Sequence, residues 1–154
     1  MGRVLLLDLD PAVSGRSRCR LLLDPPPWQV IGDTCAPVVL GVKVDGRPVK
    51  AGVEQELGTV AAPPRSLRFG VADIENPLDV DRVAVSIDGD AADPSQVVVE
   101  RIGERQVRIS VRLPEMVYGD HVVAVGVTDR APEPNVLKAT VRFRTAAAGN
   151  CALA

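Results

Sequence analysis

The chain has 154 residues, of which 46% are hydrophobic and 25% charged, so it can build one domain with its own core, and disorder of the whole chain is excluded. Its formal net charge of −2 gives no electrostatic basis for binding nucleic acid or an anionic membrane. Only 3% of the residues are aromatic, and 13 glycines and 13 prolines interrupt every long helical pattern. We therefore expect an all-β fold, with a core of β-branched side chains and little or no helix.

The first 35 residues predict a β-hairpin followed by a proline-rich connector that ends near Trp28. Residues 3–24 follow the order strand, proline, glycine, strand, aspartate, and residues 106–129 repeat it. Two interpretations stay open: a remnant of a preceding repeat, or a hairpin that packs on the rest of the chain. Asp8 and Asp10 interrupt the leading apolar run too early for a signal peptide or a membrane span.

From residue 37 onward, short segments with an apolar residue at every second position alternate with turn signals, as is typical of half-buried strands. Asp45-Gly46 and Asp88-Gly89 favour tight hairpin turns. Residues 47–64 are expected to be irregular, apart from a short strand at 57–60, and residues 146–154 to form a flexible tail. The main strands are predicted at residues 37–44, 66–73, 81–88, 96–101, 105–113, 118–129 and 136–145.

These seven strands predict an immunoglobulin-like antiparallel β-sandwich over residues 36–145, with the N-terminal hairpin as an addition. Residues 36–46 (APVVLGVKVDG), 67–89, 113–129 (LPEMVYGDHVVAVGVTD) and the closing strand resemble the bacterial immunoglobulin-like and fibronectin-type-III-like modules of secreted or cell-surface proteins. The resemblance implies a non-catalytic spacer or interaction module within a longer chain, with neighbouring domains as partners. It also implies that His121 lies at the rim of the core.

Residues for catalysis or transition-metal binding are scarce. Any Ser-His-Asp triad would have to use His121, the one histidine, and no GxSxG motif is present. The three cysteines lack CxxC spacing, so we expect no zinc or copper site and no enzyme activity. Chemistry by paired carboxylates stays open on spacing alone, because the chain has 20 acidic residues. We expect the cysteines to be buried or tail thiols, with Cys151 free in the tail, and the alternative in an exported protein is a disulfide between Cys19 and Cys35.

Two groups of residues are candidates for ligand binding. Arg68, Arg108 and Arg112 are predicted to point outward from two neighbouring strands, where they form either a basic stripe for carboxylated or sulfated polysaccharide or a solvated face that protects the sheet. Trp28 and Tyr118 are the aromatic rings left for stacking on a sugar, although Tyr118 is also placed to form a tyrosine corner. The alternative functions are therefore a carbohydrate-binding module and an adhesion module that bound calcium stiffens.

The calcium hypothesis depends on acidic residues in two loops, where several carboxylates can supply the oxygen ligands that calcium prefers. The competing interpretation is that aspartate simply favours turns. The candidate calcium ligands are Asp73, Glu75, Asp79, Asp81, Asp88, Asp90 and Asp93.

Overall fold

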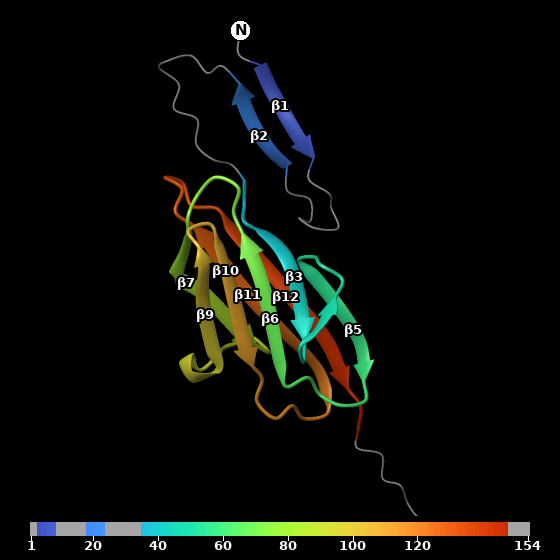
Figure 1. Cartoon of the computed structure of the whole chain (residues 1–154). Coiled ribbons are helices and arrows are strands. Elements are labelled where there is room, and N and C mark those ends of the chain that lie inside the picture. Colours follow the sequence, from blue (N-terminus) through green and yellow to red (C-terminus); the bar gives the residue numbers. More distant parts are fainter. Residues whose placement is uncertain (1–2, 9–17, 24–34, 148–154) are drawn as a thin grey trace, which may run out of the picture.

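Two five-stranded β-sheets, packed face to face, form the body of the protein in the computed structural model (Figure 1). The structure describes residues 35–147 in full, together with the backbone of β1 (Arg3–Asp8) and β2 (Arg18–Leu23). These two strands pair antiparallel, as expected for the N-terminal hairpin. The connector with Trp28 and the tail at 148–154 lie outside the described residues.

The first sheet has the strand order β4-β3-β6-β10-β9, and all its neighbouring strands are antiparallel. Its strands are β3 (Val38–Val44), β4 (Arg47–Val49), β6 (Ser66–Ala72), β9 (Val97–Gly103) and β10 (Gln106–Arg112). The second sheet has the order β5-β12-β11-β7-β8. Its strands are β5 (Glu54–Val60), β7 (Leu78–Ile87), β8 (Asp90–Ala91), β11 (Gly119–Asp129) and β12 (Val136–Thr145). A short 3-10 helix, η1 (Pro94–Gln96), precedes β9.

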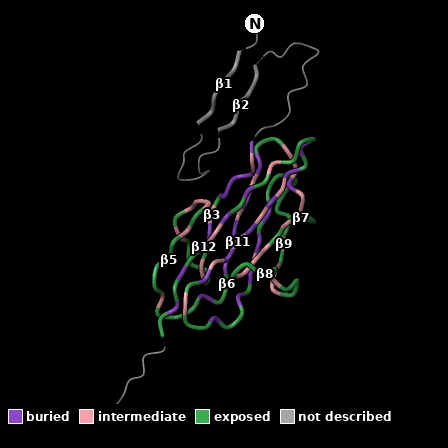
Figure 2. Tube along the Cα trace, turned by 180° about the vertical axis from the view of Figure 1, so that it is seen from behind, coloured by how far each residue is buried: buried purple, intermediate pink, exposed green. Residues whose placement is uncertain are grey.

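The alternating side chains of both sheets meet in one core. Buried and exposed positions alternate along the central strands, and Figure 2 shows this change along β11 and β12. The apolar residues at every second position of the strands now labelled β6, β10, β11 and β12 are buried, as the alternating pattern predicts. Those on β7, namely Val83, Val85 and Ile87, are partly buried against the same core. β-Branched side chains fill most of it because they suit a pleated surface.

The prediction of about seven strands is wrong for the region expected to be irregular. That region contains β4 and the whole of β5, and β8 adds a further short strand, so ten strands form the sandwich. β4 is only three residues long, and β5 carries Glu54 and Glu56 among few apolar residues. These strands are stabilised by pairing with longer strands, and a local apolar pattern does not reveal such pairing.

The sandwich is also not purely antiparallel, because β5 pairs with β12 in parallel. The register shifts between Arg142 and Arg144, where two residues of β5, Leu57 and Gly58, lie opposite Phe143 alone. Gly58 has a φ of +66°, a left-handed conformation that favours glycine. β5 and β12 are far apart in the chain, so no turn signal could have predicted this pair.

The two predicted Asp-Gly turns are confirmed. Asp45 and Gly46 have φ angles of 49° and 79°, and Asp88 and Gly89 have 53° and 91°, as a tight hairpin turn with two left-handed residues requires. Cys35, just before β3, is buried and disulfide-bonded, so the expectation of unpaired thiols is wrong for this residue. None of the described segments is a helix with the length and hydrophobicity needed to cross a membrane.

Candidate functional site

The outer face of the first sheet carries a row of cations beside a row of glycines. Lys43 on β3 lies opposite Arg68 on β6. In the adjacent row, Gly41 lies opposite Gly70, and Gly70 in turn lies opposite Arg108 on β10. Because side chains alternate across a strand, these residues project away from the core. The two glycines therefore leave a strip of bare backbone next to the cations.

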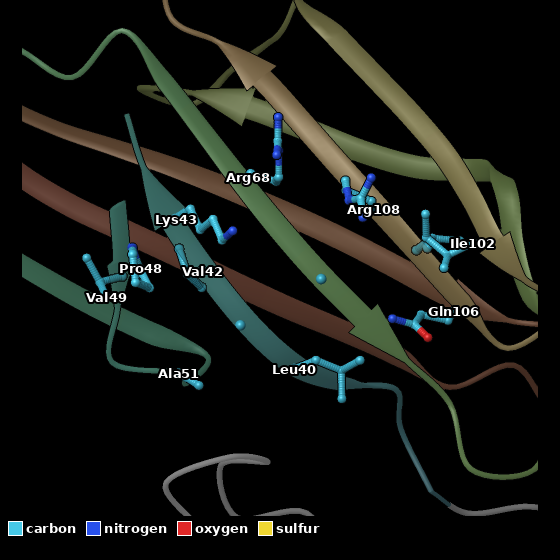
Figure 3. A pocket seen from close by; sticks show the side chains of 13 residues that line it. Leu40, Val42, Lys43, Pro48, Val49, Ala51, Arg68, Ile102, Gln106 and Arg108 are labelled. Carbon is cyan, nitrogen blue, oxygen red and sulfur yellow. The ribbon is translucent and has the colours of Figure 1, made fainter. Parts of the chain in front are cut away.

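This strip is the floor of an open groove of about 400 Å³, lined by residues of β3, β6 and β10 and of the flanking strands. Figure 3 shows Lys43, Arg68 and Arg108 on one side of the groove and Leu40 on the other. Leu40 and Ile102, which also lines it, are each 47% exposed. The groove thus combines positive charge with exposed aliphatic surface.

The three cations of the groove differ in their partners. Arg108 forms an ion pair with Glu100 on β9, with a distance of 3.3 Å between Nη1 and Oε2. Lys43 and Arg68 form no ion pair with any residue that the structure describes. Like charges directly opposite each other on neighbouring strands repel, so this pair of cations costs stability unless an anion lies nearby.

The predicted arginine stripe is therefore divided. Arg68 and Arg108 lie together in the groove, whereas Arg112 lines a separate hollow with Arg65 and Ser95. Trp28 lies outside the described residues. Sequence reasoning missed Lys43, although its place between two valines in VKV marks it as an outward residue of β3. It also missed the glycine floor, because only the register puts the two glycines side by side.

The candidate calcium ligands do not converge. Within the described residues, no group of three or more histidine, cysteine, aspartate or glutamate residues is placed to hold a metal ion. Two of the carboxylates, Asp73 and Asp93, have separate local roles. Asp73 accepts hydrogen bonds from the backbone N–H groups of Glu75 and Asn76, at 2.8 and 2.6 Å. Asp93 caps η1 by accepting from the N–H of Ser95 at 2.8 Å.

Of the other carboxylates in that set, Asp79 and Asp81 share Arg130 as a partner, but no third ligand joins them among the residues that the structure describes. Asp79 lies 3.5 Å from Arg130 and 3.6 Å from Arg82, and Asp81 lies 3.9 Å from Arg130. Asp90 is exposed on β8, and Asp88 binds His121. The carboxylates with these contacts act as turn formers and ion-pair partners. Turn formation is the interpretation that competed with calcium binding.

His121 is buried at the start of β11, and both of its ring nitrogens have partners. Nδ1 lies 2.8 Å from Oδ2 of Asp88, and Nε2 lies 2.7 Å from the backbone oxygen of Val117. Oδ1 of Asp88 accepts a hydrogen bond from the N–H of Val122 at 2.8 Å. The ring also lies beside Phe143, with 5.4 Å between the ring centroids. His121 therefore fastens the Asp88-Gly89 turn to β11.

The surroundings of His121 favour its charged form. Burial alone would lower the pKa of His121, but the hydrogen bonds to Asp88 and Val117 and the negative charges of Asp88 and Asp120 outweigh it, so the pKa is raised. Burial would likewise raise the pKa of Asp88, yet its hydrogen bonds to His121 and Val122 and the charge of His121 lower it. Each group therefore favours the ionised form of the other.

Asp88, His121 and Thr145 lie in the order of a catalytic triad, but their hydrogen bonds do not suit catalysis. Oγ1 of Thr145 is 3.5 Å from Nε2 of His121 and donates its hydrogen to the oxygen of Val117. That oxygen can only accept, so Nε2 carries a hydrogen and cannot take a proton from Thr145. Thr145 is also only 3% exposed. These three residues stabilise the corner before β11.

Tyr118 does not form the tyrosine corner that was one of its two interpretations. The side chain of Tyr118 is 67% exposed. The corner is closed instead by Thr145, whose Oγ1 accepts a hydrogen bond from the N–H of Gly119 at 3.0 Å. Gly119 has a φ of 135°, and this sharp turn directs Tyr118 outward while His121 points inward.

No protein-family model and no curated protein sequence matches the chain. Among solved structures, the crystal structure of CopC from Methylosinus trichosporium OB3b is similar to 73% of this chain and 97% of its own, with 15% sequence identity and a TM-score of 0.42. The assignment as an all-β sandwich rests on the two sheets described above. The finer resemblance to bacterial immunoglobulin-like and fibronectin-type-III-like modules stays a prediction.

Proposed function

We propose that this chain is a non-catalytic interaction module of a larger secreted or cell-surface protein, and that it binds an anionic partner in the groove of the first sheet. The observation that carries the proposal is the pair Lys43 and Arg68. These cations lie opposite each other without an acidic partner among the described residues, beside a floor of two glycines. An anion in the groove would remove their repulsion and supply charge-assisted hydrogen bonds.

Two further observations support a non-catalytic, exported module. His121 is buried and uses both ring nitrogens for structural hydrogen bonds, so it is not available as a general base. Cys35 is disulfide-bonded, and disulfides persist mainly in oxidising compartments outside the cytosol. Carboxylated or sulfated polysaccharide is one candidate partner, since Arg68 and Arg108 can bind such groups. Calcium-stiffened adhesion receives no comparable support, because its carboxylates do not converge.

The test is a titration of the full chain with polygalacturonate, heparin and poly-glutamate at low and physiological salt. We expect at least one of these polyanions to bind, more weakly as salt rises. The double variant Lys43→Ala/Arg68→Ala should weaken binding by about tenfold or more, because two charge-assisted contacts are lost. Arg142→Ala, which removes an exposed arginine from the other sheet, is the matched control and should leave binding unchanged. If no polyanion binds, or if both variants behave alike, the groove is not an interaction site and a simple spacer is the better interpretation.

A further inference from the structure

We propose that the groove of the first sheet binds an extended peptide segment in which acidic residues alternate with aliphatic ones. This inference rests on the proposed function and specifies the partner. Four features of the groove carry it: its floor, its two unlike sides and the aromatic rings that it lacks.

The floor of the groove, formed by Gly41 and Gly70, allows another chain to approach closely. Neither Gly41 nor Gly70 has a positive φ, so backbone conformation does not require glycine at either position. A Cβ atom at Gly41 would meet nothing within 4 Å, and one at Gly70 would make ordinary contacts, at 3.7 Å with Cβ of Leu40 and at 3.9 Å with the backbone N and O of Gly41. Glycine weakens the interior of a strand, and one of its uses there is to let a ligand or a second backbone come close.

The two sides of the groove differ in chemistry. Lys43 and Arg68 lie side by side on one side, and Arg108 lies at the β10 end of the glycine row, diagonal to Arg68. Leu40 lies on the opposite side (Figure 3), and Leu40 and Ile102 are the large hydrophobic residues of the lining that are exposed. A ligand that satisfies both sides must present carboxylates in one direction and apolar groups in the other.

An extended peptide has this property, because successive side chains point to opposite sides of its backbone. When such a peptide lies across the strands, its carboxylates at positions i and i+2 face the cations. Its aliphatic side chains at i+1 and i+3 then face Leu40 and Ile102. Five strands at about 4.8 Å spacing give the groove a length of about 19 Å, which matches about six extended residues. Both the charge and the length of the groove therefore fit an extended peptide of alternating acidic and aliphatic residues.

A polysaccharide fits the groove less well, because sugar rings bind proteins largely by stacking on aromatic side chains. No aromatic residue of the part of the chain that the structure describes lines the groove. Phe69 and Phe143 are buried in the core, and Tyr118 precedes β11 in the other sheet. The described residues of the groove can therefore bind the charged groups of a sugar, but they provide no aromatic surface on which its rings can stack.

The experiment titrates the full chain with a capped peptide of about eight alternating Asp and Leu residues. A block peptide of the same composition, with the Asp residues first and the Leu residues second, tests the alternation. Polygalacturonate provides the sugar comparison. We expect the alternating peptide to bind about tenfold more tightly than the block peptide, because only alternation satisfies both sides at once.

Variants then place the peptide in the groove. Arg68→Ala should weaken its binding by about tenfold, and Gly70→Ala should weaken it severalfold by raising the floor. Gly126→Ala is the matched control: a Cβ there meets Cβ of Ala84 at 3.8 Å, also an ordinary contact, but on the second sheet. Circular dichroism of each variant establishes that it is folded.

The outcomes separate this inference from the proposed function. Equal binding of the alternating and block peptides, or equal effects of Gly70→Ala and Gly126→Ala, would overturn the inference. Binding of polygalacturonate without the peptide would also overturn it, while the proposed interaction site would remain. If no anionic probe binds, both proposals fail.

Discussion

At the scale of single residues, the charge of His121 is set by the two atoms that its ring faces. A carboxylate oxygen of Asp88 and the backbone oxygen of Val117 both accept hydrogen bonds, and an imidazole donates from both nitrogens only when it is protonated. The sequence predicted a histidine at the rim of the core. It did not predict that Asp88, in a turn 33 residues away, would bind it.

The raised pKa of His121 makes the stability of the protein depend on pH. Since the folded-state pKa is above the ordinary value of 6.5, the stabilisation is complete below that value and is lost as the pH rises through the folded-state pKa. The lowered pKa of Asp88 acts in the opposite direction: its stabilisation is present above 3.8 and is lost as the pH falls through its folded-state pKa. The pair therefore contributes fully between these two ordinary values.

We predict that Asp88→Asn lowers the pKa of His121 and destabilises the protein by about 1 kcal/mol at about pH 5.5, allowing for the partial exposure of Asp88. Asparagine tolerates the φ of 53° at this position, so the turn is kept. The single histidine gives one proton NMR titration curve, and urea unfolding at several pH values gives the stability. Asp120→Asn, which removes a more distant charge, should shift the curve less. An unchanged titration in the Asp88 variant would contradict the assignment.

At the scale of elements, glycines with different backbone angles have different tasks. Gly58 has a left-handed φ of +66°, at the bulge of the parallel pair β5-β12, whereas Gly70 lies in β6 without a positive φ. The sequence does not distinguish them, because both are single glycines within or beside apolar segments. The register of the sheet decides which one has a conformational role.

We predict that Gly58→Ala destabilises the protein by about 1 kcal/mol, because alanine resists the left-handed conformation. Gly70→Ala should instead raise stability by about 0.5 kcal/mol, since alanine suits a strand interior better than glycine does. Urea denaturation of both variants measures the difference. Equal losses would mean that Gly70 is needed for the fold and would weaken the argument that its bare backbone serves a ligand.

At the scale of the whole molecule, strand direction restricts the partner of Cys35. β12 begins at the end of the sandwich where β3 begins and runs to the opposite end (Figure 1). Its ten residues span about 33 Å, whereas the four residues from Ala147 to Cys151 reach at most about 14 Å. The described part of the chain thus favours the pairing of Cys35 with Cys19 that the sequence offered as an alternative, and this pairing stays a prediction.

Peptide mapping without reduction should find the Cys19–Cys35 link, and Cys35→Ser should lower stability by about 3 kcal/mol, as expected for a loop of this length. Cys151→Ser is the control and should leave the unfolding midpoint unchanged. A mapped link from Cys35 to Cys151 would contradict the inferred pairing. Such a result would also show that the two ends of the chain meet.

The sequence by itself determined the sandwich class, the inward residues of the central strands and both Asp-Gly turns. Each of these follows from alternation or from backbone preferences within a few neighbouring residues. It also placed Arg68 and Arg108 on neighbouring strands. Only the tertiary structure decided the parallel pairing of β5 with β12, the placing of Lys43 against Arg68, the glycine floor and the bond between Asp88 and His121. These features depend on register between segments distant in the chain, which local patterns do not encode.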